Sequence, residues 1–175
     1  MSNGPLPLLL EPLKLADRGA CFSGELPLSR FTRLAALVTD TAGQVQVALS
    51  FYLDEHKQAL LQLKLETSLA LQCQRCLEEV RYPIDESFHY LISTSAEEPD
   101  FLPDGYDLLQ VGDEPLELLT MVEDELLLCL PIVAMHPEGE CDFPGGYAVQ
   151  QQDAEQATES NPFSVLAQLK RDKNP

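Results

Sequence analysis

The chain has 175 residues, 45% of them hydrophobic, so it is long enough to bury the core of one domain. Aspartate and glutamate number 29 against 11 lysines and arginines, and the net charge is -18. A chain this acidic repels phosphate backbones and attracts basic partners, so broad direct RNA binding is not expected, although solubility alone explains the acidity equally well.

The first forty residues contain short elements. Residues 5–15 are apolar and interrupted by prolines, which predicts an edge strand. Residues 20–28 alternate weakly and predict a second short strand. Residues 28–38 carry apolar side chains at helical spacing, so we expect a short helix there with Ser29 as its N-cap.

Long segments of alternating polar and apolar residues follow. They cover residues 44–55, 59–73 and 78–93, and residues 106–112 predict one more strand. Tight polar turns separate the three long segments, the first of them at residues 54–58. This pattern predicts an antiparallel meander with one buried face, in a geometry that can also curl into a barrel.

The best helical pattern spans residues 114–131. Pro115 and Glu117 lie in its expected first turn, and its apolar residues recur at a spacing of three and four. The fold class is therefore α+β, a meander packed against one central amphipathic helix, with a further short helix at the C-terminus.

The composition divides the chain into three parts. Residues 1–147 are expected to form the α+β core domain, and the polar residues 148–160 a flexible linker. Residues 161–175 predict a docking helix and tail. A helix this short is not stable alone in water, so it must dock onto its own domain or onto a partner.

Four residues offer a metal-binding pattern. Cys73 and Cys76 have the two-residue spacing with which a tight turn chelates one metal ion, and His136 and Cys141 could complete a closed zinc site. A zinc ribbon normally supplies two complete cysteine pairs, and here the second pair is incomplete. The sequence therefore does not require a cofactor, but it is compatible with a structural zinc ion.

The cysteine pair has two other interpretations. A thioredoxin-like redox site would place the pair at a helix N-terminus, but the flanking residues alternate like strands, which argues against it. The remaining interpretation is two small, half-buried residues that shape a hairpin turn.

Three adjacent acidic residues, Glu123, Asp124 and Glu125, lie on the predicted central helix. Successive helical positions diverge by roughly 100°, so the three carboxylates do not converge on one point. We expect a solvated face or a docking surface for basic residues. No motif combines a nucleophile, a base and an oxyanion hole, so the sequence does not indicate an enzyme.

The N-terminal segment is not expected to be a signal peptide. Its apolar run lacks a basic region and is interrupted by Pro5, Pro7 and Pro12. No apolar stretch approaches the length of a membrane span. Five cysteines form an odd count, unlike the disulfide framework of a secreted protein. We expect a cytoplasmic protein with no membrane partner.

Four stretches taken together resemble the YceD family, the large ribosomal RNA subunit accumulation proteins of bacteria and plastids. They are "LQCQRCLEEV", "MVEDELLLCLPIVAMH", the cysteine that follows at position 141, and "NPFSVLAQLK" near the C-terminus. Some members of the family complete a metal-like set with a second cysteine pair near Cys141, and this chain departs from that pattern.

The resemblance implies a non-enzymatic factor required for 23S ribosomal RNA accumulation, acting in large-subunit assembly or precursor processing. The expected partners are ribosomal proteins or large-subunit precursor particles. Partner contacts are expected at the acidic triplet and at two other places. These are Arg75 in the cysteine turn and a C-terminal docking motif of Asn161, Pro162 and Phe163.

Two alternatives from other classes stay open. A metal-dependent nuclease acting on precursor ribosomal RNA would need clustered carboxylates, for which Glu123 with Asp85 or Asp107 are the candidates. A zinc-stabilised protein-interaction module would need only the cysteine turn and its two partner residues.

Overall fold

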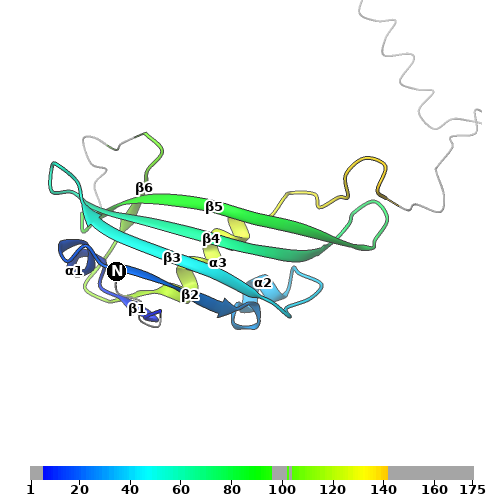
Figure 1. Cartoon of the computed structure of the whole chain (residues 1–175), viewed down its shortest axis with the longest axis horizontal. Helices are drawn as coiled ribbons and strands as arrows, with labels where there is room; N and C mark the ends of the chain where they lie inside the picture. Colours follow the sequence, from blue (N-terminus) through cyan, green and yellow to red (C-terminus); the bar gives the residue numbers. More distant parts are fainter. Residues whose placement is uncertain (1–5, 96–101, 103, 142–175) are drawn as a thin grey trace, which may run out of the picture. The chain divides into compact units, whose positions relative to one another are not determined.

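The computed structural model describes residues 6–95, 102 and 104–141. One five-stranded sheet dominates it, in the order β2 (Cys21–Pro27), β3 (Gln44–Leu53), β4 (Ala59–Gln72), β5 (Glu79–Ser93) and β6 (Asp107–Gln110). The other elements are β1 (Leu9–Leu10), α1 (Pro12–Asp17), a 3-10 turn (Leu28–Arg30), α2 (Thr32–Ala35), β7 (Leu116–Glu117) and α3 (Leu118–Leu128). Figure 1 shows α2 and α3 behind the sheet, so that they cover one of its faces.

The core lies between the sheet and these helices. Alternate residues of β3 and β4 point toward it, among them Val47, Phe51, Leu61, Leu63 and Leu65, each at most 1% exposed. Alternation with period two places every second side chain on the same face, so polar residues such as Gln46 and Lys64 fall on the opposite, open face.

The expected meander is confirmed. β2, β3, β4 and β5 pair in sequence order and antiparallel, and the sheet does not close into a barrel. β6 differs, because it pairs with β5 in parallel. Parallel neighbours need a connection of about a dozen residues or more, and β5 ends at Ser93 while β6 begins at Asp107.

Two expected elements near the N-terminus differ from the structure. The edge strand expected over residues 5–15 is reduced to β1, which pairs with β7, and Pro12 begins a helix instead. Proline suits the first helical position because its missing N–H has no partner there. The helix expected over residues 28–38 is divided into the 3-10 turn and α2, and Ser29 caps neither.

The long helix also begins later than expected. α3 starts at Leu118, because Leu116 and Glu117 pair with β1 as strand β7. The expected linker at 148–160 and the expected C-terminal helix at 161–175 lie outside the described residues. In the described part of the chain, no helix is long and apolar enough to cross a membrane.

A buried carboxylate on α3 caps α2. Oε1 of Glu123 accepts the backbone N–H groups of Arg33 (2.7 Å) and Leu34 (3.2 Å), and Oε2 accepts the Arg33 side chain at 2.9 Å. Burial alone would raise the pKa of Glu123, but these bonds from Arg33 and Leu34 lower it below its usual value. A four-residue helix without a local cap is thus held by a residue ninety positions away.

Replacement of Glu123 by glutamine should cost about 2 kcal/mol of folding stability at neutral pH, because two backbone donors and one guanidinium lose a charged acceptor. The folded pKa lies below the unfolded one, so this stability is present at neutral pH. It is lost as the pH falls below 4.5 toward the folded pKa. Urea denaturation at pH 7 and near pH 3 measures both effects.

Asp124→Asn is the matched control. Asp124 contacts the same arginine but its side chain is 50% exposed, so its loss should cost less than about 1 kcal/mol. Equal losses in the two variants would contradict the assigned role of Glu123.

Candidate metal centre

The hairpin between β4 and β5 ends in a tight turn that carries the cysteine pair. The N–H of Cys73 donates to the carbonyl of Glu78, and the N–H of Leu77 donates to the carbonyl of Cys73, both at 2.9 Å. Leu77 adopts a left-handed backbone with φ of 66°, which is unfavourable for a residue with a side chain. The turn is therefore held by surrounding interactions in a conformation that Leu77 would not adopt alone.

The loop after α3 brings the other two residues to this turn. The sulfur atoms of Cys73 and Cys141 are 3.6 Å apart, and Nδ1 of His136 lies 3.4 Å from the sulfur of Cys76 and 3.7 Å from that of Cys141. All four potential ligand atoms lie within 4.8 Å of one another. Residues more than sixty positions apart in the sequence thus form one cluster, as the spacing predicted.

These separations fit a single tetrahedral ion. Zinc–sulfur bonds of about 2.3 Å and zinc–nitrogen bonds of about 2.0 Å place neighbouring ligand atoms roughly 3.5–3.8 Å apart. The sulfur–sulfur separation of 3.6 Å and the two nitrogen–sulfur separations of 3.4 and 3.7 Å lie within about 0.2 Å of these values. Three thiols and one imidazole are also a donor set that zinc prefers. The cluster can therefore hold a metal ion.

A second contact orients the imidazole. Nε2 of His136 lies 3.0 Å from the backbone carbonyl of Glu79. A carbonyl only accepts hydrogen bonds, so Nε2 carries a proton, and in the neutral imidazole Nδ1 then has a lone pair that faces the sulfur atoms. Metal-binding histidines commonly use this arrangement, in which the second ring nitrogen fixes the tautomer.

The electrostatic surroundings favour a thiolate at Cys73. Burial would raise its pKa, but the backbone N–H groups of Cys76, His136 and Arg75 surround the sulfur and lower the pKa to about 5. Burial raises the pKa of Cys76 to about 11. A cluster of neighbouring thiols cannot lose every proton without a compensating cation, and a bound metal ion supplies that charge.

Apolar residues enclose the cluster on its inner side. Leu71, Cys73 and Val80 are buried together, and Leu130 and Ala134 pack against them. A water-poor surrounding strengthens bonds between an ion and its thiolate ligands. All five cysteines are free thiols, and the pair lies between two strands with no helix beginning at it, unlike a thioredoxin-like redox site.

The partner-binding residues predicted from the sequence already have intramolecular contacts. Arg75 donates to the carbonyls of His136 and Pro137, at 3.3 and 3.4 Å, and so fastens the two halves of the cluster. Asp124 pairs with Arg33, as Glu123 does, and Glu125 accepts the hydroxyl of Tyr90. Glu123 and Asp124 share Arg33 while Glu125 contacts Tyr90, and a docking role for the three carboxylates stays a prediction.

The docking motif at Asn161, Pro162 and Phe163 lies outside the described residues. Of the carboxylates proposed for a nuclease, Asp85 pairs with Lys64 and Glu123 with Arg33, and in the described part of the chain neither they nor Asp107 belong to a group of three metal-ligating side chains. Among the described residues, the cysteine cluster is the only group of three or more metal-ligating side chains.

Sequence reasoning missed the contacts that support the cluster. The carbonyl of Glu79 and the packing of Leu130 and Ala134 carry no residue-type signal, because backbone groups and small apolar side chains occur everywhere. The partnership of Arg33 and Glu123 was missed for a related reason. No sequence spacing identifies an ion pair between residues that are ninety positions apart.

The fold and the site together define a small α+β protein that carries a cysteine turn completed by a distant histidine and cysteine. A model of the family described as "Large ribosomal RNA subunit accumulation protein YceD" matches residues 61–170. The protein of that name from Haemophilus influenzae is 33% identical over 177 residues, which cover 98% of this chain and 99% of the relative. The chain belongs to the YceD family.

The family resemblance noted from the sequence is thereby confirmed. No solved structure matches the chain.

If the cluster holds a tetrahedral ion, cobalt(II) added to the metal-free chain should give the intense visible absorption and sulfur-to-metal charge transfer of a thiolate site. Cys141→Ser should weaken both bands, because one thiolate is lost. Cys21→Ser, an exposed cysteine outside the cluster, is the control and should leave them unchanged. Octahedral cobalt spectra in the unsubstituted chain would contradict the tetrahedral assignment.

Proposed function

We propose that the chain is a non-enzymatic factor required for 23S ribosomal RNA accumulation, acting in large-subunit assembly or precursor processing in the cytoplasm. The observation that carries the proposal is the match over nearly the whole chain to a protein named for large ribosomal RNA subunit accumulation. The five free thiols are consistent with a reducing compartment.

The proposed partners are basic ribosomal proteins or the precursor particles that contain them. The net charge of -18 opposes contact with bare RNA and favours contact with lysine-rich and arginine-rich proteins. Asp124 and Glu125 on α3 remain candidates for such contacts, as does the segment that carries Asn161, Pro162 and Phe163.

We also propose that the cysteine cluster binds zinc as a structural ion. With four protein ligands, a zinc site is closed and leaves no open position for a substrate. The ion would link the β4–β5 turn to the loop after α3, and its role would be to fix the shape of that end of the molecule.

Protein purified without a chelator should contain one zinc ion per chain. Its removal should lower the melting temperature, because the ion joins segments that are distant in sequence. Metal analysis and calorimetry measure the two quantities, and Cys141→Ser should reproduce both losses while Cys21→Ser should not. Metal-free protein with unchanged stability would contradict a structural zinc ion.

The chain should co-sediment with large-subunit precursors in a sucrose gradient at low salt. High salt should release it, because screening weakens attraction between opposite charges. Purified 23S RNA stripped of ribosomal proteins should retain much less of the chain than the precursors do. Equal retention of the chain on stripped RNA would contradict an action through basic proteins. Absence of the chain from every ribosomal fraction would contradict the proposed function.

A further inference from the structure

Exposed apolar side chains gather where the chain leaves α3. Leu128, Ile132, Val133 and Met135 are 77%, 103%, 50% and 52% exposed. Single exposed apolar residues are normal on a soluble protein, but neighbouring ones indicate a contact surface. Here they occur within eight residues of one another in a chain that is otherwise strongly acidic.

A groove lies beside them. Leu37 from the turn after α2, Leu71 at the end of β4, Leu127 and Leu130 from the end of α3, and Ile132 and Val133 line it. Its volume is about 580 Å³, which lies within the range of roughly 300–1,000 Å³ found for pockets that bind drug-sized ligands. A groove of this size and polarity accommodates a few apolar side chains from one face of a short helix.

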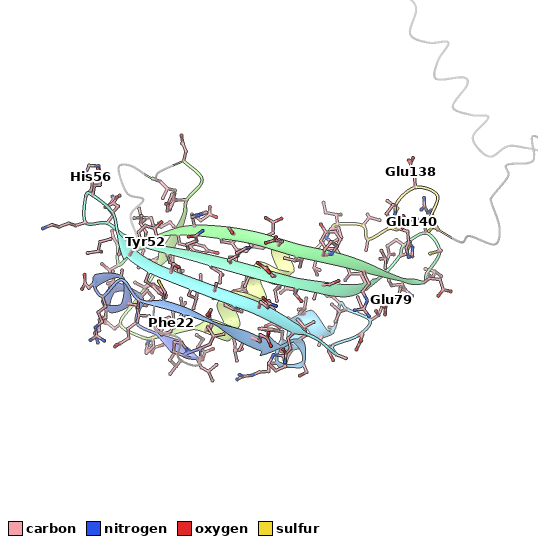
Figure 2. All side chains as sticks on the ribbon, viewed as in Figure 1. Phe22, Tyr52, His56, Glu79, Glu138 and Glu140 are labelled. Carbon is pink, nitrogen blue, oxygen red and sulfur yellow. The ribbon has the colours of Figure 1, made fainter. Side chains whose placement is uncertain are left out.

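Carboxylates lie at the end of the molecule that carries the cysteine turn. Figure 2 shows Glu79, Glu138 and Glu140 at the same end of the molecule as the cysteine turn. Gln74 of that turn lines the groove, and its N–H donates at 2.8 Å to the carbonyl of Ala134, which lines the groove beside it. Carboxylates beside an apolar groove attract a segment whose apolar side chains are flanked by lysine or arginine.

The cations near this end are already engaged. Arg33 pairs with Glu123 and Asp124, Arg81 pairs with Glu79, and Arg75 donates to two carbonyls. They do not neutralise Glu138 and Glu140, for which the described residues supply no ion pair. Among the described residues, these two carboxylates thus keep an uncompensated negative charge at this end of the molecule.

We propose that this groove docks a short apolar segment of a basic protein. It is a helix-in-groove site, in which leucine-like side chains enter between Leu37, Leu71 and Ile132 while flanking cations meet the carboxylates near the turn. A second copy of the chain is a poorer occupant, since two chains with a charge of -18 repel each other. The choice of a basic partner rests on the proposed function.

Three isoleucines allow a sharp test on the full-length, metal-loaded protein. Ile84 and Ile92 are 4% and 5% exposed in the core, whereas Ile132 lies in the groove. The probe is a synthetic helical peptide of leucine and lysine with its leucines on one face. In methyl NMR it should shift the Ile132 and Met135 signals and leave those of Ile84 and Ile92 in place.

Affinity for the peptide supplies the second measurement. Ile132→Ser should weaken binding about tenfold or more in fluorescence anisotropy, because a central apolar contact is lost. Ile132 is fully exposed, so the variant should fold normally. Leu53→Ser, an exposed leucine at the end of β3, is the matched control and should bind like the unsubstituted chain.

Four results would overturn the proposal. The first is an unchanged Ile132 signal, and the second is equal binding of a scrambled peptide or of one with glutamate in place of lysine. The third is a shift of the Ile132 methyl signal on dilution together with a change in sedimentation, which would show that a second copy of the chain occupies the groove. The fourth is a shift of the Ile132 methyl signal in the Phe163→Ser variant without peptide, which would show that the chain's own C-terminal segment occupies the groove.

The docking site and the proposed function can fail separately. A chain that co-sediments with precursors but whose Ile132→Ser variant binds the peptide unchanged lacks the groove site and keeps the function. A chain that binds the peptide through Ile132 but never enters a ribosomal fraction keeps the groove and lacks the function.

Discussion

The pairing of β4 with β5 is the constraint on which the rest of the structure depends. β4 is bonded along both edges, and its contact with β5 alone runs from Leu60–Leu91 to Gln72–Glu79. Leu61, Leu63, Leu65 and Leu69 all have 0% exposure. A slip of one residue would turn these leucines to solvent and bring Gln62 and Lys64 into the core, so burial fixes the register. The register in turn fixes where the cysteine turn begins.

The distribution of charge separates internal from external roles. Glu123 is an acid used inside the fold, where it caps a helix too short to be stable alone and orders Arg33. The same arginine also pairs with Asp124, so this cation beside α3 is already bonded within the molecule. What remains for a partner is a mostly negative surface. An ion pair removes one charge of each sign, so the excess of carboxylates expressed in the net charge of -18 remains available to a partner.

Patterns that repeat locally could be predicted from the sequence. The long strands follow from alternation, and α3 follows from helical spacing, because each residue is judged against near neighbours. The cluster of Cys73, Cys76, His136 and Cys141 was also predictable, since thiols and imidazole are rare enough to be matched across a long separation. Geometry decides whether such residues meet, and only the structure supplies it.

Long-range effects on weak local signals could not be predicted. Leu116 and Glu117 continue a helical pattern, yet they pair with β1, so α3 starts later than its sequence indicates. The helix expected across Ser29 is interrupted at Phe31, whose backbone is extended, and the cap of α2 comes from Glu123 on another element. In each case tertiary contact overrides propensity, which differs by only about 1 kcal/mol or less between most residues.

The cysteine cluster supports the groove physically. A loop whose apolar side chains point to solvent, as in Ile132 and Val133, gains no stability from their burial. It must be held by other contacts, and the structure provides them on both sides of the exposed stretch. Leu130 packs against the buried residues of the turn, and the carbonyl of Ala134 accepts the N–H of Gln74. His136 then joins the cysteines, so the cluster anchors a surface that the hydrophobic effect alone would not keep open.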